Sequence, residues 1–565
     1  MEQRWTTHYS PEAQNFDLAN MEAQTIAKML DVSAKEYGAR KALTTILPTG
    51  AETSVTYSEL RTQAEYFAIY LREVLNLRAG DTVALMTANC IGFGVASLGI
   101  AKAGCIATNI NPLYTAPEMQ HQLSDSNAQV LVIIDLFGDK VDQVIRNTAV
   151  RHVVKLSLLE FFAPFKRALL GFVLKRVKRA IPPMRSDHVT LAAALDAGRA
   201  KSATVDITAF TAEVKPTDTA LYQYTSGTTG RSKGVELSHQ AVLGNAYQAE
   251  LMTKSLLRPE GDTALVVLPL YHITAYTLSF IAGLRNGLHC VLVPSPRPIS
   301  NLKTAFEKHD VTWLAGINTL YAALLTADWF KKEMAQDIRL CASGGAAQTT
   351  GVAQKFKDLT GIEICQGYGM TECAGILTFN PIDQNRFGSV GVPVPGSQVR
   401  IVDDDGQDVA QGQPGEIIGR GPTLMSGYLN QPDATAATIR DGWLYSGDIG
   451  VMDADGFIEI VDRKKDMILV SGFNIAPNEI EDTISQLPGV AQVGVVGIPD
   501  DATGEAPAAF IVRSEDSLTE DAILAACRKG LTNYKIPKII RFVDEVPVTL
   551  SGKVLRRELR ETYLH

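Results

Sequence analysis

The sequence predicts a mixed α/β protein: a large N-terminal domain of two packed, doubly wound sheets, a small β-barrel, and an α+β C-terminal domain. From about residue 55 to residue 366, short apolar runs alternate with longer segments of helical periodicity, which is typical of parallel strands with helices on both faces of a sheet. Near Gly388 the pattern changes to short strands broken by Asp-Gly turns, as in antiparallel sheets. Beyond the charged run 462–466, apolar strands and helices return, so we place the domain boundary at that run.

The strands of the first part are short apolar runs bounded by turn residues, and they are predicted at 220–224, 264–268, 290–293 and 313–315. Helical segments between them are predicted at 239–252, 277–285 and 301–309. The alternation extends over more residues than one doubly wound sheet needs, so we expect two sheets packed against each other.

The β-barrel is expected from about residue 388 to residue 462, with strands at 399–403, 416–420 and 457–461. The C-terminal domain is expected to contain a helix, two strands, a helix and a strand, at 478–487, 490–496, 508–512, 520–531 and 539–543. We therefore predict an N-terminal domain of residues 1–462 and a C-terminal domain of residues 467–565.

Composition excludes several classes of protein. Hydrophobic residues make up 46% of the chain and charged residues 20%, so a large core can form, and neither disorder nor a disulfide-stapled mini-domain is expected. With 53 basic and 62 acidic side chains the net charge is −9, which argues against a nucleic-acid-binding protein. No apolar run is long enough for a membrane-spanning helix, and the opening residues lack the apolar core of a signal peptide. The seven cysteines are scattered without CxxC spacing, which favours reduced thiols and a cytoplasmic protein.

Segment 161–185 is a separate candidate for function, because it carries seven basic residues and no acidic one. On a helical wheel one face is apolar and the opposite face is basic. The two faces are formed by Phe165, Leu169, Phe172, Val173 and Val177, and by Arg167, Lys175, Lys178 and Arg179. Such a helix is a candidate for binding an anionic membrane surface, here the inner face of the cell membrane. The alternative is a surface helix that packs on the core and exposes only its basic face.

The strongest chemical signal is the loop from Tyr224 to Gly234, which follows a predicted strand. Its glycines allow backbone N–H groups to turn toward a ligand, its hydroxyl groups add donors, and Lys233 adds a positive charge, so the loop can hold a polyphosphate. It differs from the P-loop of kinase-type NTPases, because only two residues separate Gly230 from Lys233 and a glycine follows the lysine.

Two further clusters offer polar groups. In the heptad 366–372, Tyr368 presents a ring that can stack on a base, Thr371 a hydroxyl donor, and Glu372 a hard oxygen ligand of the type Mg²⁺ prefers. A plain strand–turn–helix is the alternative for this heptad. In the run 441–448, Asp448 can accept hydrogen bonds from the two hydroxyls of a ribose, although Gly-Asp turns are common.

The order of these motifs resembles that of the acyl-adenylate-forming superfamily, which includes acyl- and aryl-CoA ligases, firefly luciferase and the adenylation domains of peptide synthetases. The resemblance rests on the motifs 224–234, 366–372, 445–448, 462–466 and 551–553. The run 441–468 is similar to the signature of fatty-acyl-CoA synthetases, and the segments 109–116 and 268–273 are similar to bacterial long-chain fatty-acid–CoA ligases. One departure is Tyr445-Ser446, where many members have His-Thr or Arg-Thr.

The resemblance implies a role for each motif residue in ATP binding. The phosphates would be held by Thr225, Ser226, Gly227, Thr228, Thr229, Gly230 and Lys233. The adenine pocket would be formed by Gly344, Gly345, Ala346, Gln366, Gly367 and Tyr368. The ribose would be bound by Asp448 and Arg463, and Mg²⁺ by Thr225 and Glu372, with Thr371 beside them.

The resemblance also implies roles in the reaction itself. Lys553 would reach from the C-terminal domain to the α-phosphate and the acyl carboxylate, and residues 463–466, with Lys465, would be the hinge about which that domain turns. His272 would shape the acyl or thiol channel, and Tyr276 would gate the acyl tunnel. For both, the alternative is a packing role in the core.

The implied activity is ATP-dependent conversion of a long-chain fatty acid to acyl-AMP and then to acyl-CoA, with release of pyrophosphate and AMP. ATP and coenzyme A would be co-substrates and Mg²⁺ the cofactor. The alternatives are a ligase for medium-chain or aryl acids, a fatty-acyl-AMP ligase that passes the acyl group to a carrier protein, and a non-catalytic lipid-binding protein on the same fold. Nothing in the sequence indicates chain-length preference or oligomeric state.

Overall fold

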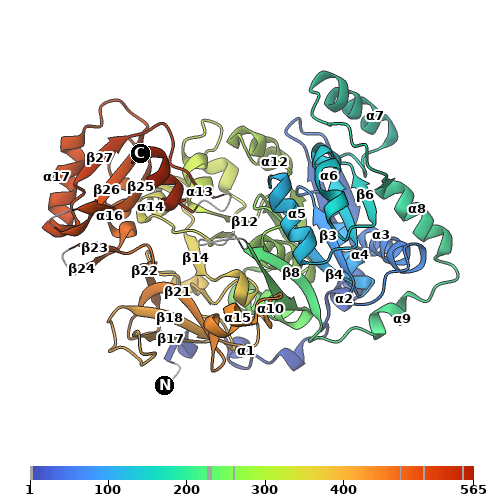
Figure 1. Cartoon of the computed structure of the whole chain (residues 1–565), viewed down its shortest axis with the longest axis horizontal. Coiled ribbons are helices and arrows are strands. Elements are labelled where there is room, and N and C mark those ends of the chain that lie inside the picture. The colour runs from blue at the N-terminus through green and yellow to red at the C-terminus, as the bar shows by residue number, and fades with distance from the viewer. Residues whose placement is uncertain are drawn as a thin grey trace.

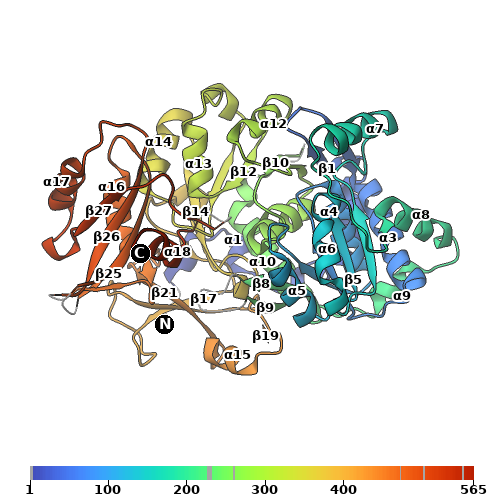
Figure 2. The same ribbon diagram turned by 45° about the horizontal axis from the view of Figure 1, so that its top comes forward.

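Two large, mostly parallel sheets adjoin in the N-terminal part of the molecule, and all their strands except β19 (Gly427–Tyr428) precede residue 394 (Figure 1). The computed structural model describes residues 4–225, 232–258, 261–470, 473–500, 503–549 and 553–564. Turning the molecule shows helices on the outer faces of both sheets (Figure 2). The arrangement confirms the predicted α/β fold class.

The nine-stranded sheet has the order β16-β15-β14-β13-β12-β10-β11-β1-β2. Strands β1 and β10 to β14 run parallel, and the edge strands pair antiparallel. Its strands are β1 (Lys41–Ile46), β2 (Glu52–Thr56), β10 (Thr263–Val266), β11 (His289–Leu292), β12 (Trp313–Gly316), β13 (Leu340–Ser343), β14 (Ile364–Tyr368), β15 (Thr378–Phe379) and β16 (Val392–Pro393).

The eight-stranded sheet has the order β19-β9-β8-β4-β3-β5-β6-β7. Strands β8 and β9 form an antiparallel pair in which Thr225 is opposite Lys233, so the loop 224–234 connects two neighbouring strands. The strands are β3 (Thr82–Met86), β4 (Ile106–Asn109), β5 (Val130–Ile134), β6 (His152–Leu156), β7 (Val189–Thr190), β8 (Thr219–Thr225), β9 (Lys233–Ser238) and β19 (Gly427–Tyr428).

Helix α4 (Ile91–Lys102) lies between the two sheets, and every one of its residues is buried. Gly92 faces Leu156 of the eight-stranded sheet, whereas Gly94 faces Leu43 of the nine-stranded sheet. The helix is apolar all round because both of its sides meet a sheet. The ammonium of Lys102 is 2.7 Å from a carboxylate oxygen of Asp31, which compensates the burial of its charge.

The other principal helices either share the core that contains α4 or pack on the opposite face of one of the two sheets. They are α2 (Ile26–Tyr37), α3 (Tyr57–Ile69), α5 (Ala116–Asp125), α8 (Leu191–Lys201), α10 (His239–Thr253), α11 (Ala282–Arg285), α12 (Lys303–Lys308), α13 (Asn318–Leu325) and α14 (Thr350–Thr360). None of the helices in the described ranges combines the length and apolar character needed to cross a membrane.

The predicted barrel is a five-stranded antiparallel sheet of β17 (Gln398–Val402), β18 (Gly415–Arg420), β20 (Ile439–Arg440), β21 (Trp443–Met452) and β22 (Ile458–Arg463). The strand pairings of the described residues do not close into a ring. The apolar face of the sheet packs instead on Cys373 and Leu377 of the large domain, so closure is not needed to bury it.

The C-terminal sheet has the order β24-β23-β26-β25, with β27 on β26. It consists of β23 (Ile468–Val470), β24 (Phe473–Ile475), β25 (Val490–Asp500), β26 (Gly504–Arg513) and β27 (Ile539–Phe542), and helices α16 (Pro477–Ser485), α17 (Glu520–Gly530) and α18 (Arg556–Tyr563) pack with it. Between β22 and β23, residues 464–467 connect the two sheets. The domain boundary that we place at 462–466 remains a prediction.

Most predicted elements are present with shifted ends. No strand was predicted at β1 and β2, because the alternating pattern becomes clear only after residue 55, and strands such as β3 to β7 and β21 were not assigned individually. The predicted helix 277–285 is a π-helix, η8 (Ala275–Ile281), continued by α11. A π-helix accommodates one extra residue per turn and is often found at functional sites.

Candidate active site

The predicted nucleotide-binding residues gather where parallel strands of both sheets end. Thr225 is the last residue of β8, Gly344 and Gly345 follow β13, and Tyr368 ends β14. A Cβ atom added to Gly344 would lie 3.1 Å from the carbonyl oxygen of Gly367, so these two motifs touch through their backbones. Ligands of open α/β sheets bind at this carboxyl edge of the strands.

Gln366, Ala346 and Thr371 flank this edge. Gln366 is buried, and its carbonyl oxygen accepts the backbone N–H of Asn380 at 3.0 Å. Ala346 and Thr371 are half-buried, and Thr371 begins the short helix η11 (Thr371–Cys373). The predicted phosphate-loop residues Ser226, Gly227, Thr228, Thr229 and Gly230 lie outside the described residues.

The two predicted ribose contacts meet the predicted base-stacking tyrosine. The hydroxyl of Tyr368 donates to a carboxylate oxygen of Asp448 at 2.6 Å, and the guanidinium of Arg463 is 3.4 Å from the other oxygen. Burial and the Asp448 charge raise the pKa of Tyr368 well above its usual value, so it is a donor at any working pH. Asp448 and Arg463 are opposite each other in the β21–β22 ladder, which fixes their spacing.

A second group surrounds Glu372. The hydroxyl of Tyr428 donates to a carboxylate oxygen of Glu372 at 2.7 Å, and the ammonium of Lys233 lies 4.7 Å from the centre of the Tyr428 ring. Thr225 is paired with Lys233 across the β8–β9 ladder. This group therefore joins the two residues predicted to bind Mg²⁺ with the predicted phosphate-binding lysine.

The donor set of this second group fits Mg²⁺. Thr225 supplies a hydroxyl oxygen and Glu372 a carboxylate oxygen, and neither a sulfur nor an imidazole ligand belongs to the group. Mg²⁺ prefers oxygen ligands and usually takes only one or two from protein, with the rest from water and phosphate.

Lys553 lies among these groups although it belongs to the C-terminal part of the chain. The residue is exposed, and desolvation by the neighbouring protein together with the charge of Arg463 lowers the pKa of its ammonium to about 8. The charges of Asp448 and Glu372 act on the same ammonium and oppose that shift. Charges of both the ribose-binding group and the Glu372 group therefore act on this one lysine.

Lys465 lies in the exposed turn that follows β22. Its pKa is lowered by desolvation, and its charge also acts on Lys553. Next to this turn, the guanidinium of Arg556 is 2.9 Å from Glu481 and 3.9 Å from Asp462. The buried carboxylate of Asp462 also accepts the backbone N–H of Asn478 at 3.0 Å. The end of β22 is therefore tied to α16 and α18.

His272 faces the same region. Burial and the charge of Lys553 lower its pKa to about 4, so the imidazole is neutral near pH 7. Tyr276 is fully buried in η8, where its hydroxyl is 3.0 Å from the hydroxyl of Ser97 and its ring packs edge-on against Phe93. The gating role of Tyr276 remains a prediction.

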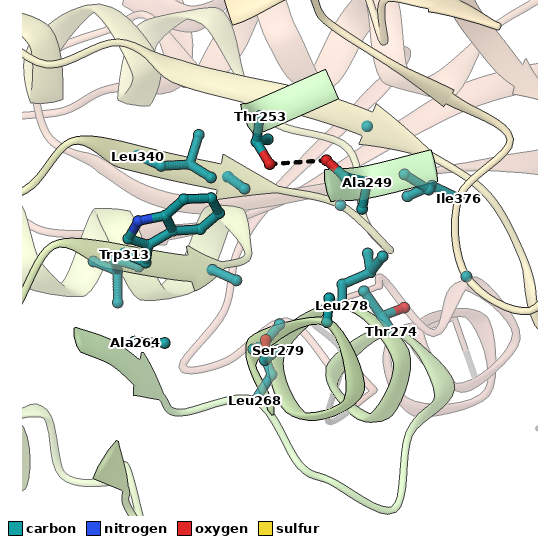
Figure 3. Close-up of a pocket in the computed structure, with 18 of the residues that line it drawn as sticks. Ala249, Thr253, Ala264, Leu268, Thr274, Leu278, Ser279, Trp313, Leu340 and Ile376 are labelled. Atoms are coloured by element: carbon teal, nitrogen blue, oxygen red, sulfur yellow. Dashed lines mark hydrogen bonds between the residues drawn. The ribbon is translucent and has the colours of Figure 1, made fainter. Parts of the chain in front are cut away.

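An apolar cavity adjoins the nucleotide-binding edge (Figure 3). Its empty volume is about 1060 Å³, which includes the open space at its mouth. Its walls are α10, η8 and α11 on one side and strands β10, β12 and β13 on the other, and Gly344, Gly345 and Gly367 lie at one end. Alanine, leucine and glycine dominate the lining, so the cavity suits an alkyl or aryl group.

Sequence reasoning missed Tyr428 and the cavity. Tyr428 belongs to β19, which has two residues and no recognisable pattern of its own. The cavity lining comes from many separate segments whose side chains are ordinary core types. A single sequence gives no signal that could have singled them out.

Segment 161–185 forms α7 (Pro164–Phe172) and the π-helix η6 (Val173–Val177). Leu170 and Leu174 pack on a small core of Leu47, Leu159 and Phe162. The predicted apolar face instead points to solvent, with exposed fractions of 80%, 55%, 61% and 67% for Phe165, Leu169, Phe172 and Val177. In both views α7 lies on the side of the molecule opposite the C-terminal sheet (Figures 1 and 2).

The fold and the clustered motifs define an enzyme that activates a carboxylate with ATP. Residues 30–429 match the AMP-binding enzyme family and residues 479–553 match the AMP-binding enzyme C-terminal domain. The chain belongs to this family.

Among proteins of this family, the chain is 41% identical over 540 residues to the long-chain-fatty-acid–CoA ligase of Escherichia coli O157:H7, covering 95% of this chain and 94% of that protein. It is 33% identical to the ligase of the same name from Bacillus subtilis (strain 168), with 90% of each chain covered. It is 32% identical to the feruloyl-CoA synthase of an Amycolatopsis species, with 90% and 94% covered.

Solved structures share the fold. The anthranilate CoA ligase AuaEII in complex with anthranoyl-AMP superposes with a TM-score of 0.84 at 26% identity, covering 97% of this chain and 98% of that one. ATP-bound MatB from Rhodopseudomonas palustris superposes with a TM-score of 0.80 at 28% identity, covering 95% and 99%.

Proposed function

We propose that the protein is an AMP-forming long-chain fatty-acid–CoA ligase. The observation that carries the proposal is that the charges of Asp448 and Glu372 both act on Lys553, beside motifs whose glycines also line an apolar cavity. A nucleotide site and an alkyl-sized cavity share the glycine-lined edge at Gly344 and Gly345. The names of the most similar relatives, such as the Escherichia coli ligase, support the choice of substrate.

In the first half-reaction, a carboxylate oxygen of the fatty acid attacks the α-phosphorus of ATP and pyrophosphate leaves. Both reactants are anionic, so neutralisation of charge is the main requirement. Lys553 supplies a cation between the ribose-binding group and the Glu372 group, and Lys233 supplies a second at the phosphate loop. Thr225 and Glu372 would hold Mg²⁺, which supplies further positive charge to the phosphates when bound.

The nucleotide is held by groups that are already oriented. Asp448 keeps its carboxylate in place through the hydroxyl of Tyr368 and the guanidinium of Arg463, ready to accept both ribose hydroxyls. The adenine is assigned to the backbone edge between Gly344 and Gly367, beside Tyr368. Preorganised groups of this kind need no rearrangement when the nucleotide arrives.

In the second half-reaction, the thiolate of coenzyme A attacks the acyl carbon, and AMP leaves with the oxygen that came from the carboxylate. Negative charge now develops on the departing AMP, and the carboxylate that met the α-phosphate in the first half-reaction has been consumed, so we assign Lys553 to adenylation. We assign residues 463–466 as the hinge about which the C-terminal part moves. The ion pairs of Arg556 with Glu481 and Asp462 attach the turn after β22 to the C-terminal domain, which would rotate.

The test is an ATP–pyrophosphate exchange assay and a thioester assay with unbranched acids of increasing length, and with ferulate and benzoate. Long-chain acids should support both reactions best. Preference for an aromatic acid would favour the aryl-CoA ligase alternative. Exchange without thioester formation would favour transfer to a carrier protein. Absence of both reactions with every acid would favour a lipid-binding role.

We propose further that α7 and η6 hold the protein on an anionic membrane. The exposed side chains of Phe165, Leu169 and Phe172 can enter the headgroup region while the neighbouring lysines and arginines contact acidic lipids, each contributing on the order of 1 kcal/mol. The substrate also partitions into lipid, so this position would shorten its path.

Sedimentation with vesicles of acidic phospholipid tests the membrane proposal. Binding should disappear when Lys175, Lys178 and Arg179 are replaced by Glu, and it should weaken in high salt. Arg167 is left unchanged because it is 3.1 Å from Glu160 and contributes to local structure. Replacement of Lys331 and Lys332 by Glu is the matched control, and equal loss of binding in it would contradict the proposal.

A further inference from the structure

Helix α5 contacts the strand pair β8–β9, which carries Thr225 and Lys233 (Figures 1 and 2). The segment 109–116, which resembles that of bacterial long-chain ligases but contributes no residue to the proposed reaction, leads into this helix. Glu118 stabilises the start of the helix by accepting the backbone N–H of Thr115 at 2.7 Å. Among the described residues, the outer side of β9 pairs only with the two-residue strand β19, so the sheet alone gives these strand ends little support.

Two side chains of α5 bind the two strand ends that flank the predicted phosphate loop. The hydroxyl of Tyr224, near the end of β8, donates to a carboxylate oxygen of Asp125 at 2.6 Å. Nε2 of His121 is 3.0 Å from the carbonyl oxygen of Ser232, directly before β9, and it must be the donor because a carbonyl oxygen only accepts. His121 and Asp125 are one helical turn apart and therefore lie on the same face of α5.

The ring of Tyr224 is buried between α5 and β9. Gly234 is opposite Tyr224 in the β8–β9 ladder, and a Cβ atom added to Gly234 would lie 3.0 Å from the tyrosine ring. The ring of His121 meets the Tyr224 ring edge-on, with 6.3 Å between the ring centres. Burial and the hydrogen bond to Asp125 raise the pKa of Tyr224 well above its usual value, so its hydroxyl remains a donor.

The position of Asp125 is unfavourable for the helix itself. Asp125 is the last residue of α5, where the negative end of the helix dipole repels a carboxylate. The hydroxyl of Tyr224 compensates this repulsion, and the backbone carbonyl of Asp125 also accepts the side-chain amide of Asn430 at 3.2 Å. Asn430 follows β19, whose Tyr428 donates to Glu372. Asp125 therefore connects β8 with the segment that contacts the predicted Mg²⁺ ligand.

We propose that His121 and Asp125 are positioning residues, which fix the ends of β8 and β9 for contact with the β- and γ-phosphates of ATP. Thr225 and Lys233 are the residues whose places they set. This inference rests on the proposed ligase function and gives α5 a part in the first half-reaction only. Acyl-AMP carries neither of these two phosphates, so the second half-reaction does not depend on the fixed strand ends.

Binding of MgATP and of AMP, measured by calorimetry in the absence of an acid, tests the inference. His121→Ala and Tyr224→Phe should each weaken MgATP binding about five- to tenfold, as expected for one lost hydrogen bond, and leave AMP binding within about twofold of wild type. His121→Gln keeps an N–H donor and should restore most of the affinity. Ser124→Ala is the matched control, because Ser124 belongs to the same helix and donates to the carbonyl oxygen of Asn147.

A double-mutant cycle tests whether Tyr224 and Asp125 act through their mutual hydrogen bond. Asp125→Ala combined with Tyr224→Phe should weaken MgATP binding no more than either change alone. In steady-state assays of these variants the KM for ATP should rise, while the KM for the acid and the conversion of supplied acyl-AMP to the thioester stay unchanged. A variant that only destabilised the fold would lower the active fraction and leave both KM values unchanged.

Equal weakening of MgATP and AMP binding would overturn the inference, as would wild-type affinity for MgATP in both His121→Ala and Tyr224→Phe, or an equal loss in Ser124→Ala. If the wild-type protein turns over no acid but His121→Ala still weakens MgATP binding selectively, the ligase function fails and the positioning role stands. If the wild-type protein is an active ligase and the variants bind MgATP normally, only the positioning role fails.

Discussion

The nucleotide-binding edge and the apolar cavity share the residues Gly344, Gly345 and Gly367 but are built in different ways. At the edge, charged and hydroxyl groups are fixed by specific partners, such as Tyr368 to Asp448 and Tyr428 to Glu372. In the cavity, ordinary core side chains leave a space whose shape depends on which strand positions are small. From this difference we expect the edge to determine the reaction and the cavity to determine which acid is accepted.

The largest effect on the reaction is expected from removing the cation at the nucleotide-binding edge. Lys553→Ala should slow acyl-AMP formation by about 10²- to 10³-fold, because one electrostatic donor to the developing charge is lost. Conversion of supplied acyl-AMP and coenzyme A to the thioester should stay near normal. Single-turnover assays of the two half-reactions measure both effects.

Lys535→Ala serves as the control for Lys553→Ala, because Lys535 belongs to the same C-terminal part and pairs with Glu479 at its surface. It should leave both half-reactions unchanged. Equal slowing of both half-reactions by Lys553→Ala would contradict the assignment of that lysine to adenylation alone.

A change at the proposed hinge should have the opposite effect on the two half-reactions. Lys465→Pro fixes φ at the turn after β22 and opposes rotation of the C-terminal part. Thioester formation should slow by about tenfold or more, equivalent to roughly 1.4 kcal/mol, while acyl-AMP formation is spared. Lys465→Ala removes the same charge without restricting φ, so a defect of the same size in it would point to the charge and not to the hinge.

The pH dependence of adenylation provides a further test of the role of Lys553. Its pKa is lowered to about 8 in the ligand-free protein, and only the protonated amine can neutralise phosphate. The value of kcat/KM, which reports the free enzyme, should therefore be constant below pH 8 and fall about tenfold per pH unit above it. Lys553→Arg should move this fall to higher pH, since arginine stays charged. His272, with a pKa of about 4, should add no step between pH 6 and pH 8.

A smaller effect on adenylation is expected when the hydroxyl group that contacts Glu372 is removed and every charged group is kept. Tyr428→Phe deletes the hydroxyl that donates to Glu372 and keeps the ring beneath Lys233. The loss should be about five- to tenfold in adenylation, equivalent to about 1 kcal/mol for one hydrogen bond. Titration with Mg²⁺ should show a higher half-saturating concentration in the variant. An unchanged Mg²⁺ requirement would contradict a role of Tyr428 in positioning Glu372.

The sequence predicted the edge far better than the cavity. Residues such as Lys233, Glu372 and Asp448 stand in short motifs whose order is informative, and the structure brings them together with Lys553. Tyr428 reaches the same place on a two-residue strand that no local pattern marks. The assignment of individual site residues nevertheless remains a proposal.

The fold class could be predicted because strand and helix periods alternate clearly. The sequence did not indicate that β1 joins β11 across some 240 residues of chain, because pairing between distant strands leaves no local signature. Segment 161–185 shows a similar limit. Its amphipathic pattern is plain, but only packing decides that Leu170 and Leu174 face the core while Phe165 and Phe172 face solvent.

The fate of one carboxylate oxygen tests most directly whether the fatty acid attacks the α-phosphorus of ATP. A long-chain fatty acid labelled with ¹⁸O in its carboxyl group is incubated with the protein, ATP, Mg²⁺ and coenzyme A, and the products are analysed by mass spectrometry. Attack of the carboxylate on the α-phosphorus predicts one ¹⁸O atom in AMP, unlabelled pyrophosphate and an equal amount of acyl-CoA. Formation of ADP with the label in inorganic phosphate would contradict the account.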